Sequence, residues 1–180
     1  MTDKFWTVDI KGYKAELPIM QLANGANIAF FNLHGNQKLT EHCAKELAKL
    51  VSDCDVLITA ESKGLQLTHC VARNLNQDYY AVARKSKKLY MQDGLEVTID
   101  ASITTGKEQK LYLSHADAKL LEGKKVAIID DVVSTGHSLR GLEEIVKLAG
   151  GKVCRKAFVL AEGDSKDMEG IEYLATIPLL

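Results

Sequence analysis

The feature that most constrains the fold is the segment 125–139, in which an apolar run ends in two adjacent carboxylates. The residues from Val126 to Ile129 carry no polar side chain, which is typical of a strand covered on both faces of a parallel sheet. Asp130 and Asp131 follow at the carboxyl end of this run, and the carboxyl edge is where open parallel sheets bind ligands. The order of residues therefore favours an α/β fold with a binding site at that edge.

A short polar turn separates the two acids from the next helical pattern. Gly136 lets the backbone approach an anion closely, and the helix that follows contributes free amide groups and the positive end of its dipole. Two acids suit the hydroxyl groups of a ribose, and such a turn suits a phosphate. We predict that the phosphate is bound by Ser134, Thr135, Gly136, His137 and Ser138.

The segment resembles the phosphoribosyl pyrophosphate (PRPP) motif of the type I phosphoribosyltransferases. The two glycine-rich signatures of other nucleotide-binding folds, Gly-x-x-x-x-Gly-Lys-Ser/Thr and Gly-x-Gly-x-x-Gly after a strand, are absent from the sequence. The resemblance covers roughly residues 40 to 160 and is greatest to the adenine and xanthine enzymes. It implies that Asp130 and Asp131 hold the ribose 2'- and 3'-hydroxyls of PRPP while the turn holds its 5'-phosphate.

The rest of the chain predicts a single domain over residues 1–180 in which strands and helices alternate. Such alternation predicts a mostly parallel sheet flanked by helices, which is the type I phosphoribosyltransferase fold. Thr40 is the expected cap of the first core helix. The polar stretch 85–114 contains two alternating segments, 95–99 and 110–113, and is expected to form a flexible flap, whereas residues 1–36 are expected to form a small hood. Strands are predicted at 55–60, 79–83, 126–129, 152–160 and 171–177, and helices at 40–51, 65–76 and 138–149.

A second anion site is predicted where the strand 55–60 turns into a helix. The turn reads Glu61-Ser62-Lys63-Gly64, and its amides, hydroxyl and ammonium group can together surround an anion. The sequence is similar to the Glu-Ser-Arg-Gly of adenine-type enzymes, in which this loop carries the pyrophosphate. Lysine in place of arginine keeps the charge but loses the two-pronged geometry.

The basic run that opens the flap supplies a further expected contact. Arg84 ends a strand, so its guanidinium group should point over the same carboxyl edge toward the pyrophosphate. The family carries an Arg-Lys pair at this point, which implies that Lys85 also contacts PRPP, as we expect for Lys88. Arg84, Asp130 and Asp131 are the predicted catalytic residues.

The resemblance implies an enzyme that displaces pyrophosphate from PRPP by a purine, with adenine as the first choice and Mg²⁺ as the cofactor. The metal should touch Asp130 and Asp131 only through PRPP or water. Adenine-type enzymes carry a flap glutamate where this chain has Thr104, although Glu108 lies nearby. In xanthine enzymes an asparagine helps to read the base, for which Asn36 is the nearest candidate, although Asn36 is equally suited to a turn. A xanthine or guanine enzyme and a non-catalytic sensor of PRPP or nucleotides are therefore kept as alternatives.

Composition limits the binding partners and the cellular location that we expect for the protein. The net charge of −1 argues against binding to nucleic acid or to an anionic membrane, and no apolar run approaches the ~20 residues that span a bilayer. The N-terminal segment lacks the apolar core of a signal peptide. We therefore expect a cytoplasmic protein, and the family resemblance implies a homodimer. Buried free thiols, rather than disulfides or a metal cluster, are expected for Cys43, Cys54, Cys70 and Cys154.

Overall fold

A five-stranded parallel sheet lies at the centre of the computed structural model, which describes residues 4–99 and 109–180. The strand order is β10-β9-β8-β4-β5, and all neighbouring strands are parallel, so their carboxyl ends lie along one edge. The α/β class expected from the sequence is confirmed. The strands are β4 (Val56–Ala60), β5 (Ala81–Ala83), β8 (Lys125–Val133), β9 (Lys152–Glu162) and β10 (Glu172–Ile177).

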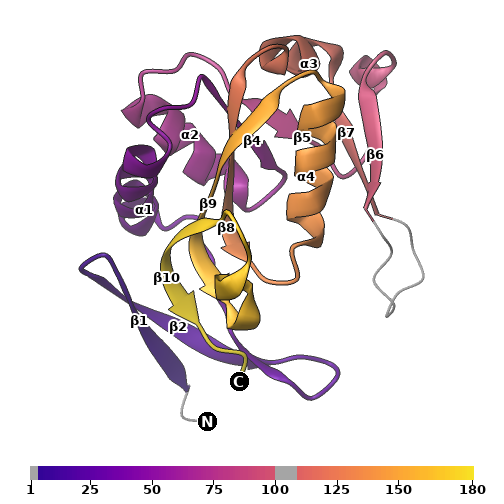
Figure 1. Cartoon of the computed structure of the whole chain (residues 1–180). Helices are drawn as coiled ribbons and strands as arrows, with labels where there is room; N and C mark the ends of the chain where they lie inside the picture. The colour runs from indigo at the N-terminus through magenta and orange to yellow at the C-terminus, as the bar shows by residue number, and fades with distance from the viewer. Residues whose placement is uncertain (1–3, 100–108) are drawn as a thin grey trace.

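Helices cover both faces of the sheet (Figure 1). On one face, α1 (Gln37–Leu50) and α2 (Gly64–Asn74) bury apolar side chains against the sheet. On the other face, α4 (His137–Leu148) and the short α3 (His115–Leu121) do the same. The central strands therefore lie between two apolar clusters, which explains why their residues are almost entirely apolar. Within residues 4–99 and 109–180, no helix is long and apolar enough to cross a membrane.

The first core helix begins earlier than expected. The side chain of Asn36 accepts a hydrogen bond from the Leu39 N–H at 3.2 Å, so Asn36 is the N-cap of α1. The predicted cap, Thr40, is wrong: it lies inside the helix, buried, and its hydroxyl donates to the Asn36 carbonyl at 2.7 Å. Both residue types suit a cap, and the buried side chain of Leu39, directly before Thr40, already belongs to the apolar face of the helix.

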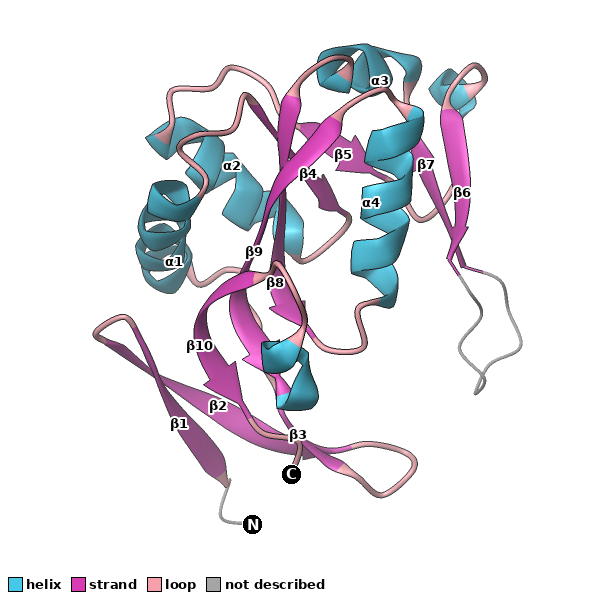
Figure 2. Cartoon of the chain, viewed as in Figure 1, coloured by secondary structure: helices cyan, strands magenta, loops and turns pink. Residues whose placement is uncertain are grey.

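The N-terminal segment forms a separate antiparallel sheet of β1 (Phe5–Ile10), β2 (Tyr13–Gln21) and β3 (Asn27–Ala29). This sheet lies at the end of the molecule toward which the strands of the main sheet point (Figure 2). It is also joined to the last residue of the chain. The Asn27 N–H donates to the Leu180 carbonyl and the Leu180 N–H donates to the Asn27 carbonyl, both at 3.3 Å.

The flap region begins with the short helix η1 (Leu89–Met91) and contains the expected hairpin, formed by β6 (Leu95–Ile99) and β7 (Gln109–Leu113). The hairpin packs against α4 at Gly141, where an added Cβ would come within 2.8 Å of Ile99. Thr104 and Glu108 lie outside the described residues. A second short helix, η2 (Gly163–Asp167), follows β9.

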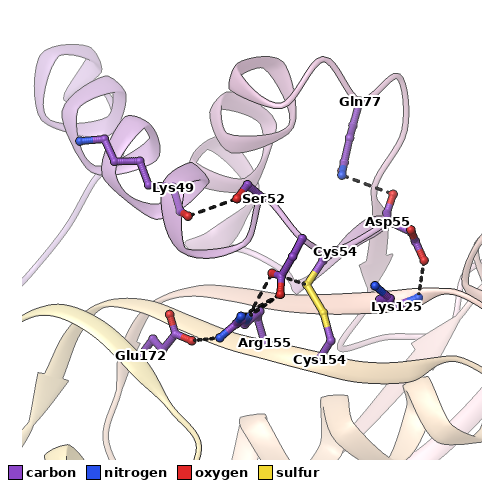
Figure 3. The surroundings of a disulfide bond; sticks show 10 residues. Lys49, Ser52, Cys54, Asp55, Gln77, Lys125, Cys154, Arg155 and Glu172 are labelled. Carbon is purple, nitrogen blue, oxygen red and sulfur yellow. Dashed lines mark hydrogen bonds and ion pairs between the residues drawn. A yellow bond between two sulfur atoms is a disulfide. The ribbon is translucent and has the colours of Figure 1, made fainter.

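Two of the four cysteines form a disulfide, contrary to the expectation from the sequence (Figure 3). Cys54, just before β4, is bonded to Cys154 in β9 across 100 residues of sequence. Val126 pairs with Val153 but Ala127 pairs with Arg155, so Cys154 is an extra residue in β9, a β-bulge. The bulge brings Cys154 and Arg155 to Cys54 and its neighbour Asp53, which pairs with Arg155 at 2.7 Å. Cys43 and Cys70 are buried free thiols, as expected.

Candidate functional site

Three strand ends bring the candidate residues together at the carboxyl edge of the main sheet. Glu61 follows β4, Arg84 follows β5, and β8 lies beside β4 on its other side. Pairing between β4 and β8 stops at Ile128, so the acidic pair lies beyond the point where β4 has turned away. The strand was expected to end at Ile129, but pairing with β9 continues to Val133 and keeps the acids in extended backbone.

The acidic pair is fixed by its own backbone and leaves one oxygen without a hydrogen bond. The Asp131 N–H donates to Asp130 Oδ1 and the Val132 N–H donates to Asp131 Oδ1, both at 2.9 Å. Asp131 is 5% exposed, and its Oδ2 is buried without a hydrogen-bond partner. Lys63 Nζ lies 3.4 Å from that oxygen, an ion pair whose geometry is not that of a hydrogen bond. A buried carboxylate oxygen in this state is an acceptor ready for a ligand hydroxyl or water.

The pKa of Asp130 differs most from its ordinary value among the acids of the site. Burial, and then the neighbouring Asp131 carboxylate, raise the pKa of Asp130 to about 7. Both effects disfavour the charged form, and the hydrogen bond from the Asp131 N–H and then the charge of Lys85 offset them only in part. A hydroxyl-rich or cationic ligand that interacts with the ionised carboxylate would relieve this penalty.

The turn after the acidic pair forms a small concave site at the start of α4. Gly136 is the N-cap of that helix, with a positive φ of 74° that favours glycine, and a Cβ there would lie 3.2 Å from the end of the Met168 side chain. A cavity of about 150 Å³ is lined by Asp130 and by every residue from Val132 to Leu139. The predicted phosphate-binding residues Ser134, Thr135, Gly136, His137 and Ser138 therefore surround one cavity next to the acids, at a helix N-terminus that favours anions.

The turn between β4 and α2 lies directly against the acidic pair. Lys63 Nζ reaches Asp131 and also donates to the Phe31 carbonyl at 3.2 Å, while it lies 5.2 Å from the centre of the Phe30 ring. The ammonium group thus connects the β4–α2 turn, the acidic pair and the segment that precedes α1. Ser62 is exposed, and the peptide bond between Glu61 and Ser62 is cis.

Gly64 has no space for a side chain. An added Cβ would overlap Thr59 Oγ1 and lie 3.0 Å from Asp130 Oδ1. We expect Gly64→Ala to lower the free energy of unfolding by about 1–3 kcal/mol, since overpacking forces backbone to shift. Urea unfolding would measure the change. The control is Thr59→Ala, which removes the blocking hydroxyl, so the double variant should lose less stability than the two single losses add up to. Strict additivity would contradict this cause.

Arg84 is held by a carboxylate rather than left free. Arg84 Nε donates to Glu61 Oε2 at 2.6 Å, and the Lys85 N–H donates to Glu61 Oε1 at 2.7 Å. Burial raises the pKa of Glu61, but these two hydrogen bonds outweigh burial and leave the pKa below its ordinary value. Glu61 is therefore an anion under Arg84, and this geometry favours a role in placing Arg84 over direct contact with a phosphate.

The remaining predicted residues make no hydrogen bond or ion pair with the acidic pair within residues 4–99 and 109–180. The Lys85 side chain is exposed, although its charge still acts on Asp130. Lys88 lines a separate open cavity of about 540 Å³ beside η1, together with Lys87, Leu89 and Gln92. Asn36 caps α1 and also lines a cavity of about 600 Å³ next to β2. The sequence analysis missed Tyr90, whose hydroxyl accepts from Arg84 Nη1 at 3.1 Å, because no local pattern signals that contact.

Comparison with known proteins finds phosphoribosyltransferases both by sequence and by structure. A family model described as a phosphoribosyl transferase domain matches residues 31–174. A xanthine phosphoribosyltransferase from Exiguobacterium sp. is 29% identical over 73% of this chain and 68% of its own length. An adenine phosphoribosyltransferase from Methanococcus vannielii is 30% identical over 68% of each chain. The solved adenine phosphoribosyltransferase of Thermoanaerobacter pseudethanolicus has the same fold, with a TM-score of 0.67 at 22% identity over 96% of this chain and 95% of its own.

Proposed function

Because the chain belongs to the phosphoribosyl transferase domain family, we propose that it transfers the phosphoribosyl group of PRPP to a purine base, with adenine as the first choice. The products are a nucleotide and pyrophosphate, as in purine salvage. The observation that carries this proposal is the convergence of the acidic pair, the cavity at the start of α4 and Arg84 at one sheet edge.

Each group at this edge has a role in the proposed reaction. Asp130 and Asp131 hold the ribose hydroxyls, and the turn from Ser134 to Ser138 holds the 5'-phosphate. A ring nitrogen of the base forms a bond to C1' as the bond from C1' to pyrophosphate breaks, and the bonding electrons leave with the pyrophosphate. The proton that the base loses passes to the pyrophosphate or to water. Arg84 and Lys63 offset the charge that gathers on that leaving group. Binding both reactants at one edge supplies their orientation.

We propose Mg²⁺ as the cofactor. The residues present fit it, because hard oxygen ligands suit Mg²⁺ and the buried Asp131 Oδ2 has no hydrogen-bond partner. Asp130 and Asp131 would touch the ion through the ribose hydroxyls or a bound water, and the ion would supply charge neutralisation of the pyrophosphate.

We place the base beside the segment that joins the N-terminal sheet to α1. The half-buried ring of Phe30 lines the cavity next to β2, with Lys63 Nζ close to its face. An aromatic ring offers a planar base a stacking surface. Residues 1–36 would then act as the hood and the β6–β7 hairpin as the flap, both parts of one domain, and together they would keep water from C1'.

Two further features complete the proposal: a homodimer and a cytoplasmic location. The homodimer is what the family resemblance implies, and the cytoplasmic location is the one expected from the composition of the sequence. The formal net charge of −1 supports small substrates rather than nucleic acid or an anionic membrane as partners.

A second candidate acceptor is xanthine, because one of the curated relatives is a xanthine enzyme at 29% identity. The test measures pyrophosphate release from PRPP and Mg²⁺ with adenine, hypoxanthine, guanine, xanthine and orotate in parallel. We expect turnover with adenine, and turnover with xanthine or guanine instead would reassign the acceptor. Binding of PRPP by calorimetry without turnover of any of the five bases would replace the enzyme with a sensor of PRPP.

A further inference from the structure

The short helix η1 carries one exposed tyrosine back to the strand end from which the flap begins. Met91 is 2% exposed and anchors the helix in the protein, while Leu89 is 91% exposed and makes no such anchor. Tyr90 lies between them, 67% exposed, and its hydroxyl meets Arg84 Nη1 at 3.1 Å. Burial of the neighbouring Met91 holds the backbone of η1 in place, and the hydrogen bond to Arg84 then holds the exposed Tyr90 side chain.

Arg84 is thereby held at three places. Its backbone N–H and carbonyl both bond to Tyr112 of β7, each at 2.8 Å. Its Nε donates to Glu61 and its Nη1 donates to Tyr90, so two edges of the planar guanidinium group are fixed. Its Nη2 has no hydrogen bond to any residue within 4–99 and 109–180. A planar group held along two edges presents its remaining donors in one direction.

We infer that Tyr90 is a positioning residue for pyrophosphate, acting through Arg84. The inference rests on the proposed function, in which Arg84 binds the leaving pyrophosphate. Glu61 alone fixes one nitrogen and leaves the guanidinium plane free to tilt about the direction of the Nε–H bond. The Tyr90 hydroxyl fixes a second nitrogen and thereby sets the plane, which matters because an arginine donates to a phosphate with two parallel N–H groups only in the correct orientation.

The location of this contact makes the expected effect specific to one end of PRPP. Arg84 follows β5 at the edge of the sheet, whereas the cavity for the 5'-phosphate lies after β8, two strands away. Loss of the Tyr90 hydroxyl should weaken binding of pyrophosphate and leave binding of the 5'-phosphate unchanged. If Tyr90 only stabilised the flap, its loss would not affect binding of pyrophosphate and of the 5'-phosphate differently.

The test compares Tyr90→Phe with the wild-type protein and with the control Tyr79→Phe. Tyr79 is also exposed, at 72%, and its hydroxyl makes no hydrogen bond to a described residue. Calorimetry with Mg²⁺ measures the Kd of pyrophosphate and, separately, of ribose 5-phosphate. We expect Tyr90→Phe to raise the Kd of pyrophosphate by about three- to tenfold, the size expected for the loss of one typical intramolecular hydrogen bond. The Kd of ribose 5-phosphate, the Tm and all values for Tyr79→Phe should stay as in the wild type.

The outcomes separate this inference from the proposed function. An unchanged Kd of pyrophosphate in Tyr90→Phe would overturn the inference, as would an equal rise in the Kd of ribose 5-phosphate or no binding of pyrophosphate by the wild type. Turnover of PRPP with the five bases decides the function instead. A chain that binds pyrophosphate through Tyr90 and turns over none of the bases would keep the inference and lose the proposed reaction.

Discussion

Replacing Asp130 and Asp131 together with asparagine is expected to lower kcat/KM for PRPP by about 10²- to 10⁴-fold. Each carboxylate would lose charge-assisted hydrogen bonds to a ribose hydroxyl, and hydrogen bonds to charged groups contribute roughly 1.5–3 kcal/mol each. Asparagine has nearly the same shape, so the fold should survive. Initial rates at varied PRPP would measure kcat/KM, calorimetry with PRPP would measure its affinity, and circular dichroism on the same sample would check the fold. Unchanged affinity for PRPP would remove the acidic pair from the site.

Replacing Asp130 alone with asparagine should make the protein more stable than the wild type at alkaline pH. The folded protein raises the pKa of Asp130 to about 7, so between pH ~4 and ~7 the folded state holds a proton that the unfolded state has released. The contribution of Asp130 to stability therefore falls as pH rises through that window. Asp130→Asn cannot release a proton and avoids this loss, so its Tm relative to wild type should rise between pH 5 and pH 8.

Asp78→Asn provides the matched control, because it makes the same chemical change at an exposed side chain. A constant difference in Tm between Asp130→Asn and wild type across this range would contradict the raised pKa. If the double variant loses activity with PRPP and Asp130→Asn gains Tm as pH rises, the carboxylates of the acidic pair promote binding while the charge of Asp130 lowers the stability of the fold.

Reduction of the Cys54–Cys154 disulfide is expected to lower the free energy of unfolding by about 2–5 kcal/mol. The bond spans 100 residues of sequence, and closing so long a loop restricts the unfolded chain strongly. Urea unfolding with and without dithiothreitol would measure the loss. The double variant Cys54→Ser/Cys154→Ser should be weakened from the start and insensitive to dithiothreitol.

The cellular setting bears directly on this bond. A reducing cytoplasm disfavours disulfides. The proposed location therefore favours two free thiols at Cys54 and Cys154, whereas the structure has them bonded. Counting free thiols in the protein isolated under alkylating conditions would show which state it occupies. Four free thiols in a protein that dithiothreitol does not destabilise would contradict the expected stabilisation.

The sequence was most informative where the signal was local. The apolar run before Asp130, the glycine turn after it and the Glu61–Gly64 turn each lie within a few residues, and all occur at the expected edge. In a parallel sheet, burial on both faces leaves a continuous apolar run that is visible without a structure. The main sheet and its two helical layers could therefore be predicted.

The contacts that were missed depend on residues far apart in the chain. The partner of Cys54 could not be found because it depends on a bulge in β9 that no composition pattern marks. Tyr90 reaches Arg84 only because η1 turns the chain back on itself. The start of α1 was missed for a different reason, since Asn36 and Thr40 are both good caps and burial of Leu39 decides between them.

The paired hydrogen bonds between Asn27 and Leu180 have a practical consequence for anyone who handles the protein. They join Leu180 to the N-terminal sheet, close in sequence to the segment beside which we have placed the acceptor base. An affinity tag or fusion partner attached after Leu180 would begin at the edge of that sheet, next to the two hydrogen bonds with Asn27. Kinetic constants for the base, more than those for PRPP, should be measured only after such an extension has been removed.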